Sequence, residues 1–170
     1  MKVFVATCDE YVSALKPFSY LFNKFWSDKI EVTILNRGVI DTYELPDNFN
    51  IVSLGVNNGI KEWTTDFYNY FKNVEDEYFI FLQEDHFFIK PFNNHIYQQL
   101  LSCLKDSDIG RVDITNTLIN KPFTTYKEIN DVKIIEMSQT SMYRVSCQPS
   151  IWSKKYMLKY IYAFKKTKRG

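Results

Sequence analysis

The stretch Tyr78-Phe79-Ile80-Phe81-Leu82, followed directly by Gln83-Glu84-Asp85-His86, decides the fold of this chain of 170 residues. Its first part is apolar at every position, a pattern typical of a strand that is covered on both faces. Such a strand lies in the middle of a sheet, with helices packed on each side. The sequence therefore predicts an α/β protein of three layers, α/β/α, in which this strand is central.

Shorter apolar runs and amphipathic patterns alternate on both sides of this strand. We expect further strands at 3–7, 31–35, 51–54, 110–114, 133–136 and 142–145, and helices at 11–26, 62–73, 96–104 and 154–165. A turn is expected at Asn36-Arg37-Gly38. The alternation predicts a mainly parallel, Rossmann-like sheet whose later strands are mixed in direction. One domain is expected over 1–164, followed by a solvated, disordered basic tail over 165–170.

The composition excludes some classes of partner and favours a cytoplasmic protein. Lys and Arg total 21 against 20 Asp and Glu, so no strong overall field attracts nucleic acid. The cysteines Cys8, Cys103 and Cys147 form no CxxC pair, which fits a reducing compartment. No signal peptide and no transmembrane segment are indicated, because no apolar run approaches the ~18 residues of a membrane span.

The residues directly after the central strand are the first candidates for chemistry. Ligands of open α/β sheets bind beyond the carboxyl ends of the strands. Glu84, Asp85 and His86 stand at that position. Oxygen ligands suit Mg²⁺ or Mn²⁺, and such an ion commonly completes its shell with substrate phosphates. The competing interpretation is an ordinary exposed acidic turn that pairs with Lys90.

Other chemistries have weaker sequence support. A zinc site could use His86 and His95, but no further ligands stand at a motif spacing. A hydrolase built on Cys8 or Cys147 would lack a nucleophile elbow. Neither a GxGxxG nor a P-loop glycine motif occurs, which disfavours dinucleotide and P-loop binding.

Three segments carry a resemblance to a known family. The hydrophobic strand ending in Gln83-Glu84-Asp85-His86 resembles the metal-binding region of GT-A fold glycosyltransferases, where a strand ends in a DxD-type motif. Gln148-Pro149-Ser150-Ile151-Trp152 is similar to the Q-x-x-x-W signature of small bacterial and viral members of that group. Val3 to Glu10 fits their first strand and nucleotide-binding turn. Here Glu-Asp-His stands where many relatives have Asp-x-Asp.

The resemblance implies a metal-dependent hexosyl- or deoxyhexosyl-transferase that uses Mn²⁺ or Mg²⁺. Its substrates would be a nucleoside-diphosphate sugar and a glycan or other hydroxyl acceptor. The implied nucleotide-binding residues are Thr7, Asp9 and Glu10, with Glu84 and Asp85 at the diphosphate, Asp85 and His86 at the metal, and Gln148 and Trp152 at the sugar or acceptor. A core anchor for the last helix is the competing interpretation of Trp152.

An inverting enzyme also needs a carboxylate that takes the proton of the acceptor hydroxyl. Asp113 is the preferred candidate, and Glu136 is the second. Arg111 precedes Asp113 by two residues and so shares its face of the strand, where an ion pair would explain both. Loops at 37–50 and 115–131 are expected to cover the site. The competing functions are a non-catalytic module that binds nucleotide sugars or glycans, and a purely structural protein.

Overall fold

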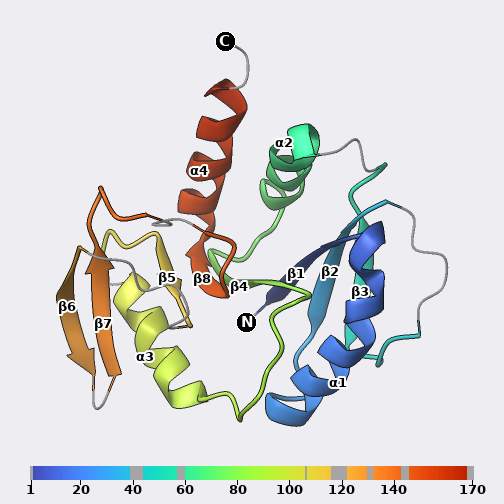
Figure 1. Ribbon diagram of the computed structural model, residues 1–170, viewed down its shortest axis with the longest axis horizontal. Coiled ribbons are helices and arrows are strands. Elements are labelled where there is room, and N and C mark those ends of the chain that lie inside the picture. The colour runs from blue at the N-terminus through green and yellow to red at the C-terminus, as the bar shows by residue number, and fades with distance from the viewer. Residues whose placement is uncertain are drawn as a thin grey trace.

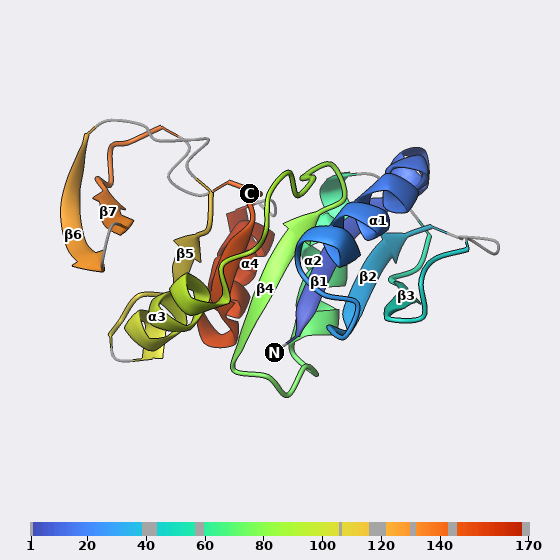
Figure 2. The ribbon, with the colours of Figure 1, turned by 90° about the horizontal axis from the view of Figure 1, so that it is seen from below.

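The computed structural model describes residues 2–38, 44–56, 60–105, 107–115, 122–129, 132–142 and 146–167. In this part of the chain, a six-stranded sheet has helices on both faces (Figures 1 and 2). Its strands are β1 (Val3–Cys8), β2 (Val32–Arg37), β3 (Phe49–Ser53), β4 (Tyr78–Gln83), β5 (Arg111–Asp113) and β8 (Ser150–Ser153). The helices are η1 (Asp9–Ala14, a 3₁₀ helix), α1 (Leu15–Phe25), α2 (Ile60–Phe71), α3 (Asn94–Lys105) and α4 (Lys154–Thr167). The predicted α/β class is confirmed.

The strand order is β3-β2-β1-β4-β8-β5. The first four strands of this order are parallel, whereas β8 runs antiparallel to both of its neighbours. The predicted mainly parallel sheet with mixed later strands is therefore confirmed. The chain runs outward from β1 to β3 and then returns to add β4 on the other side of β1. Ligands of Rossmann-like folds bind at such a reversal of strand order.

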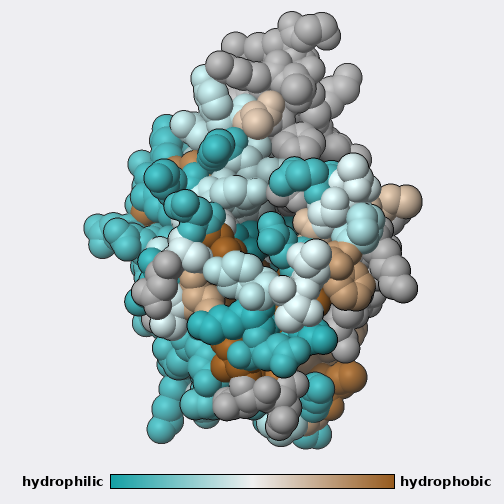
Figure 3. Space-filling view, turned by 90° about the vertical axis from the view of Figure 1, so that its left-hand side faces the viewer, coloured by the Kyte–Doolittle hydropathy of each residue, from teal (hydrophilic) through white to brown (hydrophobic). Residues whose placement is uncertain are grey.

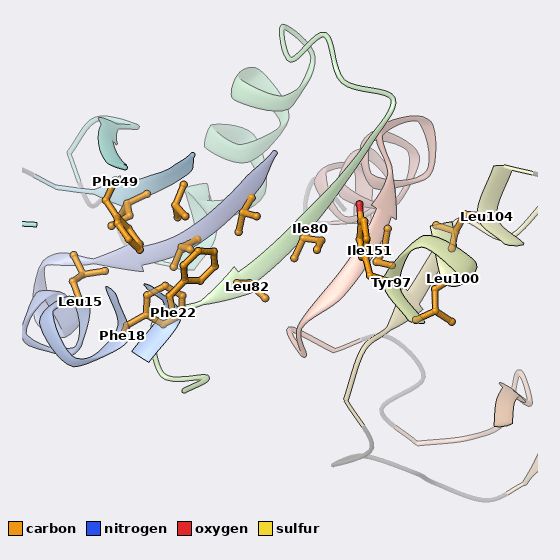
Figure 4. Close-up of a cluster of buried hydrophobic side chains, with 14 of the residues drawn as sticks. Leu15, Phe18, Phe22, Phe49, Ile80, Leu82, Tyr97, Leu100, Leu104 and Ile151 are labelled. Carbon is orange, nitrogen blue, oxygen red and sulfur yellow. The ribbon is translucent and has the colours of Figure 1, made fainter. Parts of the chain in front are cut away.

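The central strand β4 is buried on both faces, as its sequence predicts. Ile80 and Leu82 join a core shared with α1 and α3, part of which Figure 4 shows, while Phe79 and Phe81 join a second core shared with α2 and α4. The Phe79 ring stacks on Phe71 of α2 at a centroid distance of 4.8 Å. Burial of each side chain of this size stabilises the fold by roughly 1.5–3 kcal/mol, so β4 contributes to the stability of both helix layers.

The first helical segment divides at Leu15. The sequence predicts one helix over 11–26, but η1 covers Asp9–Ala14 before α1 begins. Pro17 accounts for the division, because its ring clashes with the carbonyl four residues earlier unless it lies in the first turn of an α-helix. From Leu15 onward, Phe18 and Phe22 lie on the buried face.

Two strand ends differ from prediction. Asn36 and Arg37 were expected in a turn, but they end β2, and only Gly38 turns away. Asn36 pairs with both Thr7 and Ser53 across the sheet, which extends the strand. The segment Ser150–Ser153 was not predicted as a strand, yet it forms β8 between β4 and β5.

A separate antiparallel hairpin consists of β6 (Phe123–Ile129) and β7 (Val132–Met137). The loop expected at 115–131 is therefore wrong over β6. The strand expected at 133–136 is confirmed as β7. The side of the molecule that carries this hairpin is mainly hydrophilic, with small apolar patches (Figure 3).

Some predicted segments fall partly outside the described residues. Of the strand expected at 142–145, Met142 lies in a turn and 143–145 are not described. The structure also does not describe residues 39–43, 116–121 and 130–131 of the expected loops or residues 168–170 of the expected tail. Residues 165–167 of that tail belong to α4.

Candidate functional site

Polar side chains from five strands gather along one edge of the sheet. Ala6 pairs with Gln83, so the residues after β1 and after β4 emerge side by side. Ser150, at the start of the antiparallel β8, pairs with Phe81 of β4 and with Asp113 of β5. The edge thus brings together the ends of β1, β2, β4 and β5 with the start of β8. It includes the reversal of strand order between β1 and β4.

Asp9 is held in place at the end of β1. The amide nitrogen of Asn36 donates a hydrogen bond to Asp9 Oδ1 at 3.2 Å. Gly38 has a φ of 127°, and a Cβ at this position would lie 1.8 Å from Asp9 Oδ2. Asn36 is fully buried, whereas Asp9 is exposed. The result is a carboxylate that is fixed from below and open to solvent.

The other predicted nucleotide-binding residues near β1 have different environments. Thr7 is buried, and its hydroxyl lies 3.4 Å from the carbonyl of Cys8. Glu10 is exposed on η1. Arg37, next to Asn36, forms a 3.0 Å ion pair with Asp66 and so ties the end of β2 to α2. Of the residues predicted here, Asp9 therefore has the most defined position.

The acidic turn after β4 separates its two carboxylates. The backbone N–H of His86 donates to the carbonyl of Gln83 at 3.2 Å and closes the turn. Glu84 points inward and is 7% exposed, while the Asp85 side chain is 69% exposed. Burial, opposed by a backbone hydrogen bond and reinforced by Asp85, raises the pKa of Glu84 to about 7. Only Asp85 of this pair offers an open carboxylate.

Asp85 and His86 lie together and could share a cation. His86 Nδ1 is 2.8 Å from Asp85 Oδ1, although the two atoms are not aligned for a hydrogen bond. Within the described residues, no group of three or more His, Cys, Asp or Glu side chains is arranged to hold a metal ion. An ion held by this carboxylate and imidazole alone would have to take its remaining ligands from other groups, as Mg²⁺ commonly does from phosphates and water. Within the same residues, the zinc alternative with His95 gains no support.

Asp113 sits in a polar cluster with Arg111 and Ser150. Arg111 Nη2 lies 2.5 Å from Asp113 Oδ1, which confirms the predicted ion pair on one face of β5. Arg111 Nε donates to the hydroxyl of Ser150 at 3.0 Å. That hydroxyl lies 2.9 Å from Asp113 Oδ1 and also contacts the carbonyl of Gln148, so its single hydrogen serves one of the two.

This cluster anchors one oxygen of the Asp113 carboxylate. Both contacts, from Arg111 and from Ser150, reach Oδ1, and the side chain remains 29% exposed. Burial raises the pKa of Asp113, and the charge of Arg111 opposes that rise. Burial likewise lowers the pKa of Arg111. The arrangement fixes the direction of the carboxylate, and among the described residues Oδ2 has no hydrogen bond or ion pair.

The Q-x-x-x-W segment divides between the site and the core. Gln148 is half-buried and accepts a hydrogen bond from the Thr115 hydroxyl at 3.1 Å, beside the end of β5. Trp152 is 4% exposed and packs in the core with Tyr160. The guanidinium of Arg111 lies 4.9 Å from the centroid of the Trp152 ring. Trp152 therefore supports the site through Arg111, in agreement with its interpretation as a core anchor.

Two further sequence candidates, Cys147 and Glu136, have different environments. Burial raises the pKa of the Cys147 thiol, with Arg111 lowering it and Asp85 raising it further. Glu136, the second candidate for a base, lies instead on the separate hairpin, where it lines a hollow of about 460 Å³.

A larger hollow of about 610 Å³ lies elsewhere, between α2 and the face of β1, β2 and β3. Phe4, Thr33 and Tyr70 contribute to its walls. None of Asp9, Asp85 or Asp113 lines it. The candidate edge is thus defined by its convergent polar side chains and not by this hollow.

Sequence reasoning missed Asn36, Gly38 and Ser150 as parts of this edge. The only available signal for Asn36 was its position at the end of a strand, two residues before a glycine.

Comparison with protein-family models and with curated proteins finds no match for this chain. In the described residues, no helix has the length and apolar character needed to cross a membrane.

Proposed function

We propose that this chain is a GT-A type glycosyltransferase that moves a sugar from a nucleoside-diphosphate sugar to a glycan or another hydroxyl acceptor. The observation that carries the proposal is the convergence of Asp9, Asp85 and Asp113 on one edge of the sheet, at the reversal of strand order. Each carboxylate has a distinct environment, as binding of a nucleotide, neutralisation of a diphosphate and transfer of a proton would require.

Asp9 is the residue that would bind the nucleoside. A carboxylate accepts hydrogen bonds from the hydroxyls of a ribose. Asn36 and Gly38 fix its position before any ligand arrives, which reduces the entropy lost on binding. The absence of a side chain at Gly38 is necessary for this placement.

Asp85 and His86 would hold Mn²⁺ or Mg²⁺, and the ion would neutralise the charge of the departing diphosphate. The exposure of Asp85 suits this role, because its carboxylate can reach a cation outside the sheet. Glu84, which is buried, would instead support the turn from below.

Asp113 would accept the proton of the acceptor hydroxyl through Oδ2. Arg111 and Ser150 hold Oδ1 and thereby orient the carboxylate. Burial raises its pKa, and a base works best when its pKa approaches the pH of the reaction. General base catalysis of this kind typically contributes about 10²–10⁴-fold to the rate.

The test is a thermal-shift screen with UDP, GDP, dTDP, CMP and their sugars, each with and without Mn²⁺ or Mg²⁺. A ligand that binds only the folded state raises the melting temperature. We expect one nucleotide to stabilise the protein in a metal-dependent manner. We further expect Asp85→Ala to lose the dependence on metal, whereas the control Asp108→Ala, outside the edge, should keep it.

Hydrolysis or transfer of the sugar from the stabilising donor then separates the enzyme from a binding module. Turnover that requires metal supports the transferase. Binding without turnover, with every acceptor class tried, would favour the non-catalytic module. An absence of stabilisation by any nucleotide in a folded sample would refute both.

A further inference from the structure

The charge of this chain is unevenly distributed. The segment from residue 154 to residue 170 contains Lys154, Lys155, Lys159, Lys165, Lys166, Lys168 and Arg169, and no Asp or Glu. The whole chain has 21 basic and 20 acidic residues, so removing these seven leaves 14 basic and 20 acidic residues in the first 153, a net charge of −6. The near-neutral total therefore hides a basic C-terminal segment on an acidic body.

Part of this positive charge forms an exposed stripe on α4. Met157 and Ile161 face the core. Lys155, Lys159 and Tyr162 are exposed, and their spacing of four and three residues places them along the opposite side of the helix. We call these three residues the basic stripe. The sequence continues the same spacing to Lys166 and Arg169.

The two lysines of the basic stripe form no salt bridge with the rest of the described structure. Among the described residues, no salt bridge involves Lys155 or Lys159. Lys154 is different, because its ammonium group donates to the carbonyl of Val74 and so connects the start of α4 to the segment between α2 and β4. A structural role therefore accounts for Lys154 but not for the stripe.

The position of α4 makes the stripe accessible to a large surface. The helix has 14 residues, which corresponds to about 21 Å. Its later turns project beyond the sheet, away from β1 and β3 (Figure 1). Charges on a projecting helix are less affected by the acidic body, because salt screens charge interactions beyond about 8–10 Å.

We propose that the basic stripe docks this protein on the surface of an anionic phospholipid bilayer, a role that does not depend on the proposed transferase activity. The lysines would lie at the headgroups, where basic side chains are attracted by the negative surface potential. The ring of Tyr162, about one turn after Lys159, packs partly against Tyr68 of α2 at a centroid distance of 5.9 Å and remains 46% exposed. Its apolar body and polar tip suit the interface. The apolar face of α4 is already buried against the sheet, so the helix lies on the membrane without inserting.

A bilayer fits these features better than a nucleic acid does. A nucleic acid follows a basic groove across a protein, and the body beside α4 carries a net charge of −6 in sequence, which would repel a long polyanion lying along it. A flat surface can meet the projecting helix alone. Two lysines followed by an aromatic ring on one straight face also match a planar interface.

The test is cosedimentation of the full chain with vesicles of phosphatidylcholine alone or of phosphatidylcholine mixed with phosphatidylglycerol. We expect binding only to the anionic vesicles and a decrease with added salt. Replacing both stripe lysines, by Lys155→Glu and Lys159→Glu together, should lower the partition coefficient at least about 25-fold, since each basic residue near the surface contributes a factor of about five.

The matched control is the pair Lys16→Glu and Lys29→Glu, which makes the same change in net charge at exposed positions outside α4. It should lower binding far less. An equal loss in both double variants, or equal binding to neutral and anionic vesicles, would overturn the proposal. So would binding to a short DNA duplex that is tighter than vesicle binding and is lost with the stripe lysines. Circular dichroism of each variant confirms that it is folded.

Discussion

Replacing Gly38 by Ala tests the placement of Asp9, on which the proposed nucleotide site depends. The φ of 127° at Gly38 is a conformation that a residue with a Cβ adopts at a cost of about 1–3 kcal/mol. The added Cβ would also lie 1.8 Å from the Asp9 carboxylate, so Asp9 must move. Its departure leaves the fully buried amide of Asn36 without its partner, which costs about another 1–3 kcal/mol.

Gly55 supplies a matched control. Its φ of 100° imposes a similar backbone cost on Ala, but a Cβ there would meet nothing within 4 Å. Gly55→Ala should therefore lose only the strain term, and Gly38→Ala should lose about 1–3 kcal/mol more. Urea denaturation, read as a change in midpoint at constant slope, measures both losses.

Ligand binding completes this test. Gly38→Ala should abolish the stabilisation by the preferred nucleotide, while Gly55→Ala should retain it. If the two variants lose equal stability and both keep the nucleotide effect, then Asp9 does not depend on Gly38, and the reasoning for a preorganised nucleotide site fails.

Three further predictions concern Asp113, Ser150 and Glu84. Asp113→Asn should keep donor stabilisation in the thermal-shift assay but lower the transfer rate at least about 100-fold, and a fully active variant would exclude Asp113 as the base. Ser150→Ala should cost about 1–3 kcal/mol in urea denaturation, because the fully buried hydroxyl bridges Arg111 and Asp113, whereas an unchanged midpoint would contradict that bridge. The folded-state pKa of Glu84, about 7, lies above its ordinary value of 4.5, so the folded protein binds more protons than the unfolded chain between these pH values. The free energy of unfolding should therefore fall by up to about 3 kcal/mol as the pH rises from 4.5 to 7. Glu84→Gln removes this effect and should be more stable than the wild type at pH 8. Parallel pH profiles of stability for the two proteins would show that Glu84 titrates normally.

The parts of the fold with strong local signals could be predicted from the sequence. β4 is a continuous apolar run, and α1 has apolar residues at helical spacing, so both elements were found. β8 was not, because Ser150–Ser153 is short and becomes a strand through pairing with β4 and β5, which are distant in sequence. β6 shows no alternation of burial, because almost all of its residues are exposed.

The same distinction applies to the candidate site. The ion pair of Arg111 and Asp113 follows from their spacing on one strand, and the structure confirms it. The contact of Ser150 with Asp113 joins residues 37 positions apart, so no local pattern could indicate it. The inward direction of Glu84 was also unpredictable, since it depends on how the turn after β4 closes.

The position of β8 between β4 and β5 has a consequence for how the chain folds during synthesis. The parallel strands β3, β2, β1 and β4 can associate once synthesis has passed Gln83, because all four are then present. β5 follows soon afterwards but has no neighbour in the sheet until residues 150–153 emerge. For that interval β4 carries an unpaired edge, which is the feature of nascent sheets most prone to wrong pairing. Completion of the sheet thus requires a strand that inserts between two strands made earlier, and the hydrogen bonds of β4 close only after synthesis has passed Ser153.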